Sequence, residues 1–403
     1  MIDVLQETLC DHFSDDTLTA CCFLTKAINR KIAYYWFKRF AIVPENAPLI
    51  LYPGLRIRAH KSYAVMSLCP FFTDYQPIRS LFCTLSESTD TAASELESIG
   101  HFTNLHPIKS LILYIRGDYL SDIEPLLWLH CRCPDITIIG DVSLRNERKF
   151  RPHHFKGQSW DHITSLSASS PAMFTTYGRR ITLDLITARH LQELRLTDSS
   201  MSGKTWSRFL ARMSIPDLTV FEIDGNVSLK VVCSFLARHT GVDNLILGTS
   251  ILSRSCHSEI AVLPRLMYLQ APVRLALPFL RVNTALTRLT LLRDSQSTTK
   301  DFREVLLSLV GTSVYSLTLP VDAESMQELG ALHIPTCLRF VQTLSLNVTD
   351  VFSPPMLVSR ILYYVPCGEL FSSKLADFHQ TTGCLTTSPS PSLSYGAERN
   401  RAS

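Results

Sequence analysis

The chain has 403 residues, 46% hydrophobic and 19% charged, a composition that is typical of a globular protein and excludes wholesale disorder. The 39 Lys and Arg nearly balance the 36 Asp and Glu, so the bulk charge gives no reason to expect nucleic acid or an anionic membrane as a partner. The N-terminus has early carboxylates and no basic region, unlike a secretory signal, and no apolar run reaches the roughly 18 residues that a membrane helix needs. We therefore expect the 12 cysteines to be reduced and mostly buried, and the protein to be cytoplasmic or nuclear.

Residues 3–42 predict a small helical unit. Apolar residues recur at helical spacing on both sides of the triplet Ser14-Asp15-Asp16, which ends one run and supplies N-cap chemistry for a second helix. The aromatic-rich stretch 34–40 closes the unit. The apolar positions of its predicted helices are Leu5, Leu9, Phe13, Leu18, Leu24 and Ile28.

Four short stretches of this unit carry a family resemblance. They read Asp-His-Phe-Ser-Asp-Asp at 11–16, Leu-Thr-Ala-Cys at 18–21, Phe-Leu-Thr-Lys-Ala at 23–27 and Trp-Phe-Lys-Arg-Phe at 36–40. Together they resemble the body of a fungal-type F-box, which is commonly followed by degenerate leucine-rich repeats. The unit departs from that family at its start, where Met1-Ile2 replace the usual Leu-Pro, and at Thr25 and Lys26, which replace the usual Cys and Arg.

The resemblance implies that residues 1–42 bind a Skp-type adaptor protein and, through it, a cullin. The six apolar positions match the family's helices, so some of them would pack internally and others would face the adaptor. From the residues alone, an alternative is open: all six form the core of a helical cap, which protects the apolar end of a repeat array.

Residues 43–76 are interrupted by several prolines and predict a linker that leads irregularly into the first repeat. Within it, 50–52 and 55–57 are candidate short strands.

From residue 77 to 371 the pattern L-x-x-L-x-L recurs, as in Leu191, Leu194 and Leu196. Its central positions run from 81 to 344 in ten steps, and 344 − 81 = 263 gives a mean step of about 26 residues, within the roughly 20–29 residues of leucine-rich repeats. These positions are Leu81, Leu111, Ile136, Leu166, Leu194, Phe221, Leu245, Leu269, Leu289, Leu317 and Leu344. The predicted fold class is α/β: a leucine-rich-repeat-like solenoid with short parallel strands inside and helices outside.

Amphipathic helices are predicted between these strands, each with one apolar face. The predicted ranges are 122–130, 205–213, 229–238, 301–309 and 356–364. One repeat buries too few side chains to offset its loss of chain entropy, so the repeats have to stack.

Two segments depart from the repeat pattern. The insert 140–160 carries interleaved basic and aromatic residues; a nucleic-acid or phosphopeptide patch is conceivable, but the balanced charge of the chain favours a solvated loop. The Ser/Thr/Pro-rich tail 372–403 is poor in apolar residues and is expected to be disordered.

The sequence contains no nucleotide-binding, zinc-protease or serine-hydrolase motif. His130-Cys131-Arg132-Cys133 lacks the second ligand pair of a structural zinc site, and Cys133 fits better as the first apolar position of a repeat. We therefore expect a protein that is not an enzyme, with no catalytic residue, no cofactor and no metal.

The resemblance and the repeats together predict a non-catalytic substrate-recognition subunit of a cullin–RING ubiquitin ligase of the Skp–cullin–F-box type, whose repeat region binds a target protein. The alternative is a leucine-rich-repeat scaffold for protein–protein interaction without ligase coupling. The outward positions between the strand leucines are the candidate target-binding residues. They include Glu193, Arg195, Glu222, Asn244, Ile246, Arg288, Thr290, Ser316 and Thr318.

Overall fold

The computed structural model divides the chain into two units, Met1–Phe352 and Ser353–Ser403, and all residues that it describes belong to the first. The described residues are 12–14, 17–18, 21, 35, 49–51, 80–85, 95–96, 99–100, 103–104, 108–115, 133–140, 162–186, 190–198, 201–252, 260–321 and 341–348. The insert 140–160 beyond residue 140, the predicted helices 122–130 and 356–364, the candidate strand 55–57 and the tail 372–403 lie outside these ranges.

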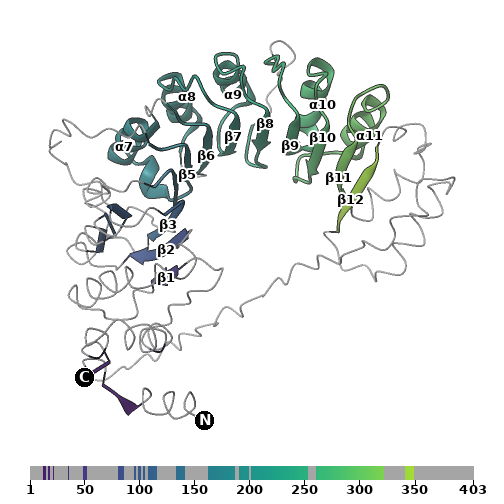
Figure 1. Cartoon of the computed structure of the whole chain (residues 1–403). Helices are drawn as coiled ribbons and strands as arrows, with labels where there is room; N and C mark the ends of the chain where they lie inside the picture. The colour runs from purple at the N-terminus through teal and green to yellow at the C-terminus, as the bar shows by residue number, and fades with distance from the viewer. Residues whose placement is uncertain are drawn as a thin grey trace, which may run out of the picture. The chain divides into compact units, whose positions relative to one another are not determined.

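A single parallel sheet of 12 strands organises the described residues, and its strands lie side by side in the order of the sequence (Figure 1). This arrangement is α/β and repeat-like, because each strand pairs only with its neighbours along the chain. The strands are β1 (Leu49–Leu51), β2 (Ser80–Leu85), β3 (Ser110–Ile115), β4 (Asp135–Gly140), β5 (Ser165–Ala168), β6 (Glu193–Asp198), β7 (Val220–Gly225), β8 (Asn244–Leu247), β9 (Tyr268–Pro272), β10 (Arg288–Leu292), β11 (Ser316–Val321) and β12 (Thr343–Val348).

The helices whose bounds the structure describes lie on one side of the sheet, between residues 171 and 308 (Figure 1). They are the 3-10 helix η2 (Pro171–Phe174) and the α-helices α7 (Thr176–Ile186), α8 (Gly203–Ala211), α9 (Leu229–Leu236), α10 (Val273–Val282) and α11 (Thr299–Ser308). Neighbouring helices need roughly 8–10 Å between their axes, whereas neighbouring strands need only about 4.8 Å. The helices therefore take the outside of the bend that this mismatch produces.

The predicted register of the repeats is confirmed by the strand pairing. The central positions from Leu81 to Leu344 are aligned with one another across every pair of neighbouring strands from β2 to β12. Each of them is buried except Leu344 on β12, which is half-buried. We call this aligned row of inward side chains the inner ladder.

Most strands alternate between buried and more exposed residues, as in β6, where Leu194 and Leu196 are buried and Arg195 is not. Aromatic residues extend the core toward the helices. Phe174 packs on Trp206 of α8 with ring centroids 5.5 Å apart, and Phe221 of β7 packs on Phe235 of α9 at 4.6 Å. The core is therefore a continuous apolar layer between the sheet and its helices.

Three predicted helices, 205–213, 229–238 and 301–309, are confirmed as α8, α9 and α11 with boundaries shifted by a few residues. Helices α7 and α10 were not predicted from the sequence. The helix α10 contains Pro278 and follows β9 with no intervening loop, so it lacks the usual start signal and carries a helix breaker.

Two findings concern the first 76 residues. The predicted N-cap at 14–16 is confirmed at Ser14, whose Oγ accepts a hydrogen bond from the Thr17 backbone N–H at 3.2 Å. The candidate strand at 50–52 is confirmed with a shift of one residue as β1, which pairs with β2. The sheet therefore begins inside the stretch expected to be a linker.

Two buried polar side chains near the C-terminal ends of helices make the same pair of bonds in different repeats. His239 Nε2 accepts a hydrogen bond from the Ile215 N–H at 3.0 Å, and its Nδ1 therefore carries the proton that it donates to the Phe235 carbonyl at 2.8 Å. Asn283 repeats this arrangement further along the array. Its Oδ1 accepts from the Leu263 N–H at 2.7 Å, and its Nδ2 donates to the Phe279 carbonyl at 3.0 Å.

His239 and Asn283 lie six residues before the central positions Leu245 and Leu289. The residues that donate to them, Ile215 and Leu263, likewise lie six residues before the central positions of the preceding repeats. These bonds therefore satisfy equivalent backbone N–H groups of the preceding repeat. Because the bond is made to a buried donor, losing it leaves an unpaired polar group inside the protein.

A substitution of Gly225 tests the close approach of β6 and β7. Gly225 has φ +146°, and a Cβ atom there would lie 2.2 Å from the Asp198 carbonyl oxygen. We expect Gly225→Ala to lower the free energy of unfolding by about 2–4 kcal/mol through backbone strain and overpacking. Chemical denaturation measures this. The matched control is Gly203→Ala at the start of α8, whose Cβ would meet the Asn226 carbonyl oxygen only at 3.4 Å, and which is expected to change stability by less than about 1 kcal/mol.

The buried histidine predicts a pH dependence of stability. Burial lowers the pKa of His239, an effect that outweighs the raising effect of its hydrogen bond to Phe235 and is reinforced by Arg238. The unfolded chain therefore binds a proton at a higher pH than the folded chain, and stability falls as the pH drops below about 6.5. We expect His239→Asn, which copies the chemistry of Asn283, to remove this contribution to the pH dependence. Urea unfolding of both proteins from pH 8 to pH 5 measures it, and an unchanged difference in stability over that range would contradict the prediction.

Candidate protein-binding surface

The helices whose bounds are described cover one side of strands β6–β12 and leave the other side free of them (Figure 1). The half-buried and exposed residues of these strands, most of them polar, form a surface on that other side. We call this surface the open face. The strand register aligns it in two rows on either side of the inner ladder. The first row is Glu193, Val220, Asn244, Tyr268, Arg288, Ser316 and Thr343, and the second is Arg195, Glu222, Ile246, Gln270, Thr290, Thr318 and Ser345.

All nine target-binding residues predicted from the sequence lie in these two rows, and each is half-buried or exposed. The rows also contain Val220, Tyr268, Gln270, Thr343 and Ser345, which were not predicted. Tyr268 and Gln270 lie on either side of the central Leu269, so the rule that residues next to a central position face outward would have found them.

The region of the open face on β6 and β7 carries a small charge network. Arg195 lies between two carboxylates, with its guanidinium nitrogens 3.3 Å from Glu222 and 3.7 Å from Glu193. All three side chains are partly exposed, so these ion pairs contribute little to stability. Their effect is to neutralise Arg195 and to leave this region of the face mildly acidic.

The region on β9 and β10 is built differently. Tyr268 and Gln270 on β9 lie directly beside Arg288 and Thr290 on β10, which makes a square of four outward side chains. The Tyr268 hydroxyl donates to Gln270 Oε1 at 2.9 Å and lies 3.3 Å from Thr290 Oγ1. The Arg288 guanidinium lies over the Tyr268 ring, 5.4 Å from its centroid. We call this square the Tyr268–Arg288 cluster.

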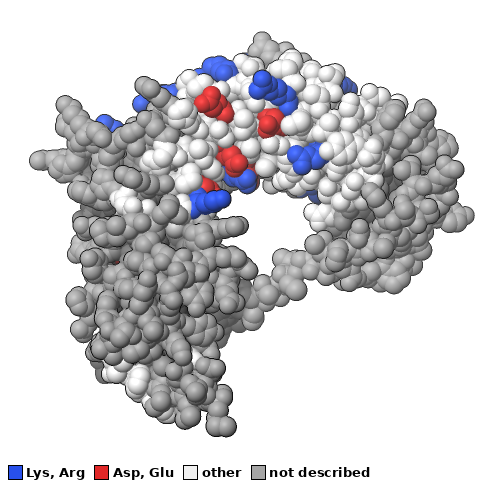
Figure 2. Space-filling view, viewed as in Figure 1, with Lys and Arg blue, Asp and Glu red and all other residues white. Residues whose placement is uncertain are grey.

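Charged residues of both signs are interspersed with wide uncharged areas over the described surface in Figure 2, and this view shows no large patch of one sign. Such a surface suits a specific protein contact better than the uniform attraction that a phosphate backbone requires.

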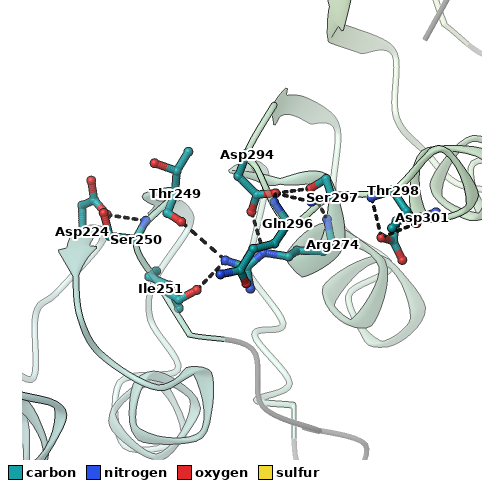
Figure 3. Close-up of polar contacts among 10 residues, drawn as sticks. All are labelled: Asp224, Thr249, Ser250, Ile251, Arg274, Asp294, Gln296, Ser297, Thr298 and Asp301. Carbon is teal, nitrogen blue, oxygen red and sulfur yellow. Dashed lines mark hydrogen bonds and ion pairs between the residues drawn. The ribbon is translucent and has the colours of Figure 1, made fainter. Parts of the chain in front are cut away.

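The loops at the C-terminal ends of β8 and β10 are tied together by a buried ion pair (Figure 3). Arg274, the second residue of α10, donates from Nε to Asp294 Oδ2 and from Nη2 to the Ile251 carbonyl at 2.6 Å. Only 9% of the Arg274 side chain and 4% of the Asp294 side chain are exposed. This pair links three successive repeats, because Ile251, Arg274 and Asp294 follow β8, β9 and β10.

The other oxygen of Asp294 holds its own loop, since Oδ1 accepts from the Ser297 N–H at 2.6 Å and the Gln296 N–H at 3.1 Å. Asp224, at the end of β7, holds a turn in a similar way by accepting from the Ser250 N–H at 3.0 Å (Figure 3). These carboxylates fix the turns that follow the strands, and with them the spacing of the strands that carry the open face.

Of the candidate adaptor-binding residues, the structure describes Phe13 and Leu18, whereas Leu5, Leu9, Leu24 and Ile28 lie outside the described residues. Phe13 is half-buried and Leu18 is fully buried. Leu18 therefore packs inside and would support a binding surface without contributing to its contacts.

No protein-family model matches this sequence, and a search of curated proteins finds no match either. Within the described ranges, no group of three or more His, Cys, Asp or Glu side chains is placed to hold a metal ion, and no helix is long and apolar enough to cross a membrane. Cys133 of the His-Cys-Arg-Cys stretch is buried, as its predicted place in a repeat requires, while residues 130–132 lie outside the described residues.

A double-mutant cycle on the buried ion pair tests its role. We expect Arg274→Met to lower the free energy of unfolding by about 3–5 kcal/mol, because it leaves the Asp294 carboxylate buried without its cation. Adding Asp294→Asn should restore some of that loss, which urea denaturation measures. The matched control is the partly exposed pair of Arg195 and Glu222, where Arg195→Met should cost less than about 1 kcal/mol. Equal losses at the two arginines would rule out the proposed role of burial.

Proposed function

We propose that this chain is a leucine-rich-repeat protein that acts as the substrate-recognition subunit of a Skp–cullin–F-box ubiquitin ligase. In this proposal residues 1–42 bind the Skp-type adaptor, and the open face binds a target protein. The observation that carries the recognition half is the open face itself: two aligned rows of polar and aromatic side chains on consecutive strands, uncovered by the helices that pack on the other side.

The repeat assignment is supported by one strand per repeat and by the residues that follow the motif. The leucine-rich-repeat pattern L-x-x-L-x-L-x-x-N/C places an Asn or Cys three residues after its third leucine position. Arg274 and Asp294 stand at that position in the repeats of Leu269 and Leu289, in place of the Asn or Cys of the pattern. Both bond to neighbouring turns of the array, the kind of link that a polar residue at this position supplies.

The adaptor half of the proposal depends on the resemblance of residues 11–40 to the F-box. The Ser14 N-cap supports it, since the F-box-like interpretation requires a helix to begin just after this triplet. No bond chemistry would take place on this chain. It would act by proximity, raising the effective concentration of a target lysine near the charged ubiquitin-conjugating enzyme.

The second candidate function is a leucine-rich-repeat scaffold that binds proteins through the same face without an adaptor. The full burial of Leu18 is compatible with it, because a helical cap on the array uses its apolar residues internally. The two candidates differ only in what residues 1–42 bind.

A pull-down with the purified Skp-type adaptor separates the two candidates. We expect the full chain to capture the adaptor and Leu9→Asp to abolish capture, since a charge on an apolar contact is costly to desolvate. The matched control is Ile246→Asp on the open face, which should retain adaptor capture. Thermal melting of each variant checks that the repeat region stays folded.

Affinity purification from cells, with residues 1–42 present or deleted, tests the target-binding half. Targets that are retained by the deleted form and lost with Ile246→Asp support the open face as the recognition surface. Absence of adaptor capture by the full chain favours the scaffold, and targets that are insensitive to open-face substitutions rule out the recognition role in both candidates.

A further inference from the structure

We propose that the Tyr268–Arg288 cluster is the anchor point of the open face and that it docks an acidic side chain, Asp or Glu, of the target protein. This inference deepens the proposed function and rests on it, because it names the chemistry of the target at one place on the recognition surface.

The cluster holds its aromatic ring in place before any target binds. The Tyr268 hydroxyl is engaged by Gln270 at 2.9 Å and lies 3.3 Å from Thr290 Oγ1, so the ring is tied at its far end. The Arg288 guanidinium, 5.4 Å from the ring centroid, is oriented by the ring. A side chain that is already ordered loses less entropy on binding, which raises the affinity that each contact yields.

Arg288 keeps its charge available to a partner. Among the residues that the structure describes, none forms an ion pair with Arg288, and its side chain is exposed. The carboxylates within the two rows, Glu193 and Glu222, lie on β6 and β7, and Glu222 pairs with Arg195. Asp243, just before β8, accepts a hydrogen bond from Asn244 at 2.7 Å. Three strand spacings, about 14 Å, separate β7 from β10, which exceeds the screening length of about 8 Å at physiological ionic strength.

The neighbours of the cluster favour a protein segment over a phosphate backbone. Ile246 flanks it on β8, and the short side chains of Ser316 and Thr318 flank it on β11. The site therefore combines one cation, one aromatic ring and one aliphatic side chain. The two rows contain no further Lys or Arg from β8 to β12. Tyrosine and arginine are the side chains most enriched at binding hot spots, and a guanidinium can bind a carboxylate through two hydrogen bonds.

A selection from a displayed library of random 12-residue peptides, made on the full-length chain, tests the proposal. We expect peptides selected on the wild-type protein to be enriched in Asp and Glu relative to the input library. Selection on Arg288→Glu should reverse the enrichment to Lys and Arg. Wild-type-selected peptides should bind Arg288→Glu at least about tenfold more weakly, the loss expected for a hot-spot residue.

Two further variants make the outcome specific. Arg288→Lys keeps the charge but loses the planar fork, so it should retain the acidic preference with weaker binding. Ile246→Asp alters the open face beside the cluster, and circular dichroism melting of each variant checks the fold. If no selected peptide depends on Arg288, the proposal is overturned. Peptides lost with Ile246→Asp but indifferent to Arg288 would overturn it while leaving the open face as a binding surface, whereas indifference to both variants would remove the open face as well.

Discussion

The alignment of one apolar residue per strand across the sheet is the constraint on which the rest of this structure depends. A strand of four to six residues cannot keep its inward leucine away from water alone; the leucines on the two neighbouring strands do so. The inner ladder therefore fixes the strand order, the parallel direction and the register together. A shift of one residue would turn every inward leucine outward, so the outward rows inherit their alignment from the buried one.

The repeat interval and the inner ladder could be predicted from the sequence, because leucine spacing reports directly on which side of a strand is buried. The positions from Leu81 to Leu344 were predicted in register, and α8, α9 and α11 had clear helical periodicity. The helix α10 was missed for two reasons: Pro278 is a helix-breaking residue inside it, and the 20-residue repeat leaves no loop between β9 and the helix to signal its start. Tertiary packing on β9 and β10 overrides that local preference.

The polar contacts could not be predicted, for a different physical reason. That Arg274 meets Asp294 depends on how far two turns from different repeats approach each other, and spacing along the chain does not encode that distance. The Tyr268–Arg288 cluster is similar: the register places its residues side by side, but it does not encode that the Arg288 guanidinium lies over the Tyr268 ring. The spacing of the central positions predicts which residues belong to the rows of the open face. The contacts between side chains on neighbouring strands decide which of these residues bind one another.

The buried ion pair has a mechanical consequence for the array. A stack of repeats bends and twists by small changes at each joint between neighbours, so its compliance is set joint by joint. The joints around α10 are cross-braced by Arg274, which holds the preceding turn through Ile251 and the following turn through Asp294, over the shortest step in the chain. This stretch is consequently expected to resist bending more than a joint that lacks such a cross-repeat contact. The relative placement of β9 and β10, and with it the spacing of the outward residues that they carry, is therefore held from the far side of the sheet.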